Sequence, residues 1–387
     1  MPQRIRAVAI LSLGWLGAVS APLVGQAPPA AADAAPAPAP APPPSFKLSG
    51  YAEASYVYST EAAPPNTIVG RLYDRYSDAF TLNALKLTAD RPYNAKKLDA
   101  GVHADVLVGQ NATLLQSSGF SVGTDGDVTQ LYVTLNVPTK SGNGVQVKAG
   151  KMVTMMGVEV IEDVVNPVWS EGNQFIYVEN FTSTGVEVDF KPSSATDVEL
   201  RVDNGWDRIV VTDGHKSFMG RVGIAAGANT TLGVVGYVGD QESGISAARY
   251  GLDVVVNQKV GSKTSIWVQG DYGKESANAA LPDPTQDATW WALGGWLATD
   301  LSPKANLALR ADYLDDAQGA RTLLVPLGFT NPPGVAHKLW SLTGTLNVKT
   351  FPNVLLRPEV RYDHSNFPVF NGNSGQASVA LSVAYLY

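Results

Sequence analysis

The chain has 387 residues, a formal net charge of −7 and no cysteine. The lack of cysteine excludes a disulfide framework and a thiolate metal site, and the acidic balance makes nucleic acid a poor partner. Behind the N-terminus, no apolar run approaches the roughly 18 residues of a membrane-spanning helix. These limits exclude a helical membrane protein but leave a β-barrel open, because alternate residues of barrel strands face water.

The N-terminal residues 1–27 have the pattern of a secretory signal peptide, with Arg4 and Arg6 ahead of the apolar run Ala7–Val19. A membrane anchor is the alternative, although the apolar run is short for one. Residues 28–45 are rich in alanine and proline, a composition that favours a semi-rigid linker over a packed core. We therefore expect an exported chain whose folded part spans residues 46–387.

From Phe46 onward, about sixteen segments alternate between apolar and polar residues with the period of two that defines a β-strand. In one of them, Leu200 and Val202 alternate with Arg201 and Asp203. The predicted strands are Phe46–Ser59, Phe80–Asp90, Leu98–Gly109, Asp127–Val137, Gly144–Met152, Thr184–Lys191, Asp197–Asn204, Ser217–Ala226, Thr230–Gly239, Tyr250–Gln258, Lys263–Gly273, Ala288–Thr299, Lys304–Leu314, Lys338–Lys349, Asn353–Asp363 and Gln376–Tyr387.

The connections between these segments alternate strictly in length. Short, turn-like links such as Gly261–Ser262 are followed by long ones such as Asp315–His337. Such alternation is expected when one end of a membrane barrel faces the periplasm and the other faces outside. The sequence therefore predicts an all-β fold, a transmembrane antiparallel up-and-down β-barrel of about sixteen strands with long extracellular loops and short periplasmic turns. The alanine- and proline-rich linker would then be periplasmic.

Aromatic residues lie where such a barrel would meet the two membrane interfaces. On the apolar face, Tyr250, Tyr272 and Tyr362 lie at the long-loop ends of their strands, and Tyr385 and Tyr387 lie at the opposite end. The last strand is amphipathic and ends on the aromatic Tyr387, which resembles the signal that the bacterial barrel-assembly machinery recognises. We expect this machinery and outer-membrane lipid as partners.

Two of the predicted strands contain residues whose structural consequences the alternation does not settle. Pro358 lies inside Asn353–Asp363, and because proline cannot donate a ladder hydrogen bond, we expect a bulge there. Trp290 and Trp296 share one face of Ala288–Thr299, whereas Trp291 lies on the other. We expect Trp290 and Trp296 to face lipid, with an inward Trp291 that stacks on a sugar as the alternative.

The longest connection, Val153–Ser183, is rich in acidic residues and lies between the fifth and sixth strands. Its position resembles that of the loop that narrows the lumen of sixteen-stranded porins. An acidic loop in the lumen would favour cations; an acidic loop on the outer surface is the alternative. The candidate constriction residues are Glu159, Glu162, Asp163 and Glu171 on the loop and Arg201, Arg221, Arg310, Arg357 and Arg361 on the inward strand faces.

The strand charges are expected to line water, because each charge facing lipid near the midplane would cost roughly 2–4 kcal/mol. The alternative is that they pair with each other and only hold the wall rigid.

The same loop also carries a family resemblance. The run Asn166-Pro167-Val168-Trp169-Ser170, followed by Phe181-Thr182-Ser183-Thr184-Gly185, resembles the signature of the OmpL-like β-barrel porin family. The residues that carry the motif are Asn166, Pro167, Ser170, Phe181, Thr182, Thr184 and Gly185, whereas Ser183 replaces the family's histidine. The resemblance implies an outer-membrane channel for ions or small hydrophilic solutes.

An enzyme is not expected. The four histidines, His103, His215, His337 and His364, have no acid or nucleophile beside them in a recognisable motif. We expect no metal or other cofactor, since the acidic residues lack the spacing of a calcium loop. The expected function is passive diffusion of ions and small hydrophilic solutes through a water-filled pore in the bacterial outer membrane. A homotrimer is expected only by analogy with general porins, and a receptor or adhesin that uses the long loops is the alternative function.

Overall fold

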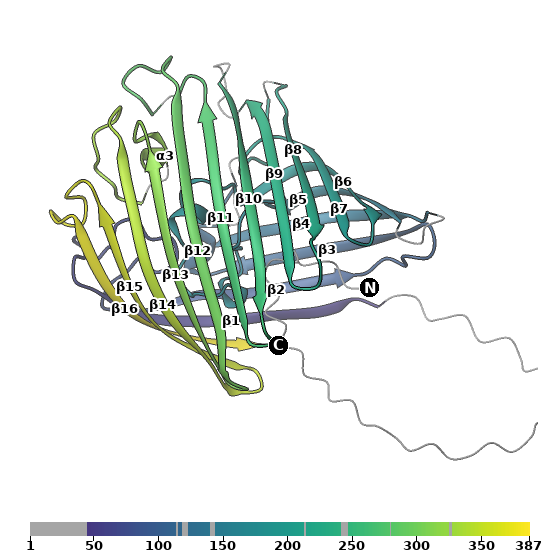
Figure 1. The fold of residues 1–387 in the computed structure, drawn as a ribbon, viewed down its shortest axis with the longest axis horizontal. Coiled ribbons are helices and arrows are strands. Elements are labelled where there is room, and N and C mark those ends of the chain that lie inside the picture. The colour runs from purple at the N-terminus through teal and green to yellow at the C-terminus, as the bar shows by residue number, and fades with distance from the viewer. Residues whose placement is uncertain are drawn as a thin grey trace, which may run out of the picture.

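The computed structural model describes residues 45–113, 115–117, 123–139, 144–212, 214–240, 247–278, 280–324 and 327–387. Within these ranges, sixteen antiparallel strands close into one barrel. Each strand pairs with its neighbours in the chain, and β1 pairs with β16 to close the cylinder (Figure 1). The predicted signal peptide and almost all of the predicted linker fall in residues 1–44, outside the described residues.

The strand boundaries agree with the predicted segments to within three residues, because the alternation of apolar and polar residues stops where each strand ends. The strands are β1 Lys47–Ser59, β2 Ala79–Arg91, β3 Asp99–Val108, β4 Gly126–Val137, β5 Val145–Val153, β6 Thr182–Ser193, β7 Thr196–Asp203, β8 Ser217–Ala225, β9 Thr230–Asp240, β10 Ala248–Val260, β11 Thr264–Glu275, β12 Ala288–Ser302, β13 Ala305–Asp316, β14 His337–Phe351, β15 Val354–Ser365 and β16 Gly375–Leu386. The predicted fold class is confirmed.

In the described parts of the long connections there are four short helical segments, α1 Gln110–Thr113, the 3₁₀ segment η1 Asp163–Val165, α2 Asn173–Tyr177 and α3 Ala320–Leu324. Of the helices in the described ranges, none has the length and apolar character needed to cross a membrane.

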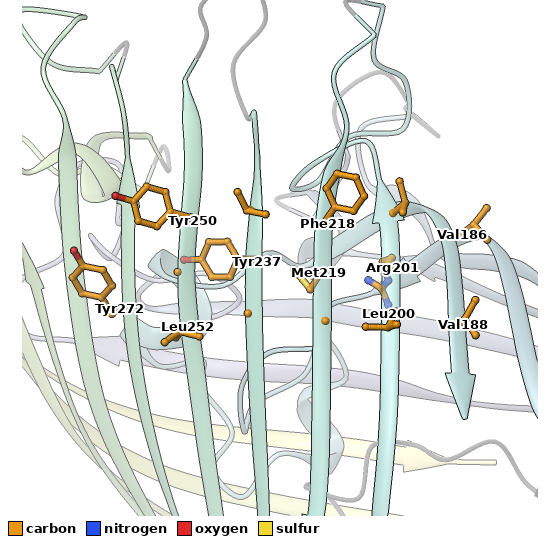
Figure 2. A pocket seen from close by; sticks show the side chains of 15 residues that line it. Val186, Val188, Leu200, Arg201, Phe218, Met219, Tyr237, Tyr250, Leu252 and Tyr272 are labelled. Atoms are coloured by element: carbon orange, nitrogen blue, oxygen red, sulfur yellow. The ribbon is translucent and has the colours of Figure 1, made fainter. Parts of the chain in front are cut away.

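The period-two alternation sorts the side chains between the two faces of the wall. On β7, Leu200 and Val202 are 53% and 42% exposed on the outside, whereas Arg201 and Asp203 are buried inside at 4% and 2%. Figure 2 shows this region of the wall, where Leu200, Phe218, Leu252 and their neighbours surround a shallow apolar hollow on the outer face between β6 and β11. An apolar outside and a charged inside are the arrangement that a bilayer requires of a barrel.

The predicted aromatic belts lie on the outer face. Tyr250, Tyr272 and Tyr362 are well exposed toward the long-loop end, and Tyr385 and Tyr387 are exposed at the other end. At the chain end, the Tyr387 amide donates to Gly50 of β1 at 3.0 Å, so the terminal aromatic lies at the seam where the barrel closes.

Two detailed predictions are wrong. Trp290 and Trp296 are buried inside the barrel, and Trp291 is 44% exposed outside, where its ring lies beside Tyr313. The strand has apolar residues on both faces, so its alternation did not reveal which face points inward.

The bulge expected at Pro358 is also absent. Thr345 lies opposite Glu359 and Val348 opposite Leu356, so the register does not shift across the proline. The loss of one N–H is tolerated without an inserted residue. Beside Pro358, the Arg357 side chain donates to Asn347 Oδ1 at 2.7 Å.

Candidate functional site

The connection between β5 and β6 lies inside the barrel, and we call residues 154–181 the inner loop. Its side chains are almost all buried; Trp169, Phe175 and Tyr177 are each 1% exposed or less. Its polar groups bond to strands far away in sequence. Trp169 Nε1 donates to Glu53 of β1 at 3.0 Å, and Val158 N donates to Gln269 of β11 at 2.9 Å. The inner loop is thus packed against the inside of the wall.

Three side chains of β15 hold the middle of the inner loop by its backbone. Arg357 donates to the carbonyl oxygens of Asp163 at 2.5 Å and Asn166 at 2.8 Å. Glu359 accepts the amides of Trp169 and Ser170, at 2.8 Å and 3.2 Å.

Arg361 completes this row of contacts. It donates to Ser170 Oγ at 3.1 Å and to the Glu171 carbonyl at 2.6 Å. Alternate residues of a strand share a face, which is why Arg357, Glu359 and Arg361 point inward together. Because irregular backbone that leaves water needs hydrogen-bond partners, this row satisfies groups that would otherwise be costly to bury.

Arg310 of β13 forms the second attachment. Its guanidinium, whose side chain is 0% exposed, contacts Glu159 Oε1 at 2.6 Å and Asp312 at 3.0 Å and donates to Ser170 O. Glu159 also accepts Trp296 Nε1 at 3.1 Å and the Gly172 amide at 2.7 Å. A buried ion pair is stable only when its remaining donors and acceptors are satisfied, as they largely are around Glu159.

The other predicted acidic residues of the inner loop are also engaged. Glu162 forms an ion pair with Lys86 of β2. Burial, with the adjacent Glu53 carboxyl, raises the pKa of Asp163 well above its ordinary value. Burial, with the charges of Glu159 and Asp163, does the same to the pKa of Glu171. Burial and neighbouring carboxylates therefore favour the neutral forms of these two side chains.

The two remaining predicted arginines lie elsewhere. Arg201 of β7 is bonded to Glu187 at 2.9 Å and to the carbonyl of Val153, where the inner loop begins, at 3.0 Å. Arg221 of β8 forms ion pairs with Asp197 and Glu199 of β7. The structure thus brings Arg310, Arg357 and Arg361 onto the inner loop, places Arg201 at its start and leaves Arg221 on the neighbouring wall.

The first family-motif run forms a turn within the inner loop. The Asn166 side chain accepts the Val160 amide and donates to the Val160 carbonyl, both at 2.9 Å, and also donates to Glu171 at 3.0 Å. The Pro167 carbonyl accepts a hydrogen bond from Asn347 at 2.9 Å. These contacts fix the segment that β15 holds through Ser170.

The second motif run marks the return into β6. Phe181 packs against Phe175 with ring centroids 5.1 Å apart, and Thr182 N donates to Asp207 at 2.8 Å. Thr184 and Gly185 lie in β6 itself. A Cβ at Gly185 would lie 2.1 Å from the Val202 carbonyl, so the close approach of β7 requires glycine there.

Several residues of the site were not found from the sequence. Glu53, Lys86 and Gln269 contact the inner loop from three different strands. Their inward phase on each strand was the available signal, but it does not say which inward residue meets the loop. Asp207, in the β7–β8 connection, offered no sequence signal.

One histidine of the described residues, His337, lies between two hydroxyl groups. His337 Nε2 lies 2.8 Å from Ser365 Oγ, and its Nδ1 lies 3.0 Å from Thr322 Oγ1. His337 and Ser365 are completely buried, so this contact ties loop and strands together. Across the described ranges, no group of His, Asp and Glu is arranged to hold a metal ion.

Comparison with known proteins identifies the family and the structural neighbours of this barrel. Residues 45–387 match the family described as "Putative beta-barrel porin-2, OmpL-like". No curated protein matches the sequence. Among solved structures, the outer membrane channel DcaP of Acinetobacter baumannii is similar with a TM-score of 0.58 at 13% identity, over 88% of this chain and 97% of that one.

Two further barrels show the same fold. The anion-selective porin from Comamonas acidovorans has a TM-score of 0.59 at 9% identity, over 89% of this chain and 99% of its own. The trimer form of Vibrio cholerae OmpT has a TM-score of 0.56 at 11% identity, over 89% and 99%. Matched over its whole barrel and sharing the fold of outer-membrane channels, the chain belongs to the OmpL-like family of beta-barrel porins.

Proposed function

We propose that the protein is an outer-membrane porin through which ions and small hydrophilic solutes diffuse passively. The single observation that carries the proposal is the position of the inner loop within a closed barrel of sixteen strands. A barrel of this strand number is wide enough for an aqueous channel, whereas eight strands would fill with side chains. The inner loop would then narrow the channel without sealing it.

The proposed constriction includes the predicted acidic and basic residues in two different roles. Glu159, Arg310, Arg357 and Arg361 would hold the inner loop in the bore, because their charged groups are used in contacts with it. Glu162, which is 18% exposed at its side chain, would face the solute path. Arg201 and Arg221 would line the opposite wall.

The assembly of the barrel in the membrane is part of the same proposal. The C-terminal strand would be read by the barrel-assembly machinery, and the apolar outer face would contact outer-membrane lipid. A homotrimer is supported by the similarity to the trimer form of OmpT. The predicted signal peptide would direct the export that this location requires.

Planar-bilayer recording of the purified barrel tests the function. We expect discrete, ohmic conductance steps, and closure in three equal sub-steps if the protein is a trimer. A barrel that inserts correctly but stays electrically silent would refute the porin and favour a receptor that uses its long loops. Reversal potentials across a salt gradient would then report ion selectivity.

A further inference from the structure

The two sides of the barrel interior differ in their contact with water at equal depth. Counted from the periplasmic ends of their strands, Glu199 on β7 and Ala308 on β13 are both fourth residues, as are Lys148 on β5 and Arg357 on β15. The side chains of Glu199 and Lys148 are 14% and 21% exposed. Ala308 and Arg357 are 0% exposed, beneath the inner loop.

The same contrast holds on a descending pair of strands. Asp189 is the fifth residue from the end of β6, and Ser382 is the fifth from the end of β16. The Asp189 side chain is 22% exposed, whereas Ser382 is 0% exposed. Distance from the strand end is therefore not the cause of the difference. The inner loop contacts β10–β15, β1 and β2, and its Met155 and Met156 pack on Met219 of β8. Near the periplasmic ends of β5–β8 it leaves the wall in contact with water.

The open wall carries a compact group of charges that we call the charged strip, formed by Lys148, Asp189, Asp197, Glu199 and Arg221. Their strands are adjacent, with Asp189 directly opposite Glu199 and Glu199 directly opposite Arg221. Arg221 binds both β7 carboxylates, and Asp189 lies 3.9 Å from Lys148. Lys191, which shares the inward face of β6 with Asp189, adds a third base beside the three carboxylates, so this wall carries charges of both signs.

We infer that small ionic solutes cross the barrel along the charged strip, between the β5–β8 wall and the inner loop, and that the carboxylates and bases of the strip act on them as they pass. The inference rests on the proposed porin function. Charges that stay in contact with water, in a bore whose walls have a low dielectric constant, act on passing ions. Charges that are buried and paired, such as Arg310 with Glu159, mainly hold the wall and loop together.

Cysteine accessibility tests the path, because the chain has no cysteine of its own. Asp189→Cys places a thiol on the charged strip, and Ser382→Cys places one at equal depth under the inner loop. Val188→Cys, on the outer face of the same strand, controls for lipid-side reaction. A positively charged methanethiosulfonate reagent is added during bilayer recording of each variant.

We expect the reagent to reduce the conductance of Asp189→Cys in steps, at a rate at least tenfold above that of Ser382→Cys. Val188→Cys should keep its conductance. Equal modification of the two inward positions, or faster modification of Ser382→Cys, would overturn the path. If the unsubstituted protein shows no conductance at all, the porin function itself is refuted. Failure of the path and failure of the porin function are therefore distinguishable.

Ala298→Cys provides a second buried position that gives up no hydrogen bond. Ala298 is the fifth residue from the end of β12 and is 2% exposed. It should resemble Ser382→Cys and remain slow. If Ala298→Cys blocks as fast as Asp189→Cys, water reaches both walls and the proposed path is wrong.

Discussion

The β13–β15 wall and the β5–β8 wall use the same kinds of residue for different purposes. Arg310 and Arg221 both lie on inward strand faces, and each contacts two carboxylates. Arg310 is completely covered and also binds the inner-loop backbone, whereas Arg221 remains at the edge of the open bore. The comparison shows that an inward charge in a barrel has no fixed role. A charge that the inner loop covers attaches the loop, whereas a charge that stays uncovered is available to solutes.

The largest expected effect comes from breaking the attachment at Arg310. Arg310→Met leaves Glu159 buried without its cation, so the free energy of unfolding should fall by about 3–5 kcal/mol. With the inner loop loosened, single-channel conductance should rise and become noisy. Urea unfolding in detergent micelles and bilayer recording would measure both effects.

Arg221→Met is the matched control on the other wall. Its carboxylate partners can rehydrate from the bore, so the stability loss should be clearly smaller, and conductance should stay steady. The double variant Arg310→Met/Glu159→Gln should recover part of the lost stability, because it removes the unpaired charge. Equal losses for Arg310→Met and Arg221→Met would remove the distinction between the walls.

The strands could be predicted from the sequence because their physics is local. A strand such as β7 shows its two faces in consecutive residues, and a membrane penalises every charge on the wrong side. The same reasoning is weak where both faces are apolar, which is why the orientation of Trp290, Trp291 and Trp296 was wrong. Pro358 shows another limit, since the register continues unchanged across a residue that has no backbone donor.

The site was less predictable because its contacts join distant parts of the chain. The loop acids and the inward arginines could be named, but their pairing could not. Arg310 meets Glu159 across 151 residues, and Arg357 meets Asp163 across 194. Arg221 on β8 and Arg310 on β13 occupy the same kind of inward position in the alternation of their strands. Their different roles depend on where the inner loop lies in the folded barrel.

A smaller effect is expected on ion selectivity. The triple change Asp189→Asn/Asp197→Asn/Glu199→Gln should lower the cation-to-anion permeability ratio by a factor of about 2–5 at low salt, since these carboxylates contact water. The matched triple change Glu159→Gln/Glu162→Gln/Asp163→Asn on the inner loop should lower it less, because two of its carboxyls are buried. Reversal potentials in a salt gradient give both ratios. A larger shift from the loop triple would place the selective charges on the inner loop instead.

The smallest expected effect concerns the pH dependence of stability that arises from Asp207, which binds the C-terminal end of the inner loop. Asp207 Oδ1 accepts the amides of Phe181 and Thr182, at 2.9 Å and 2.8 Å. Burial raises the pKa of Asp207 from 3.8 to about 6. Since the folded state holds this proton more tightly than the unfolded state, the contribution of Asp207 to stability falls as pH rises between about 4 and 6 and is level above that range.

Asp207→Asn keeps an oxygen acceptor for both amides but cannot ionise. Thermal unfolding in detergent should therefore show a smaller loss of stability from pH 4 to pH 7 for Asp207→Asn than for the unsubstituted barrel. Asp283→Asn, in an exposed loop where hydrogen bonds from Thr285 lower the carboxyl pKa, should leave the loss over this range unchanged. The difference in pH slope between the variants is the quantity that decides. An identical pH slope for all three proteins would mean that Asp207 is ionised throughout, and that the protein tolerates a free charge at the point where the inner loop enters β6.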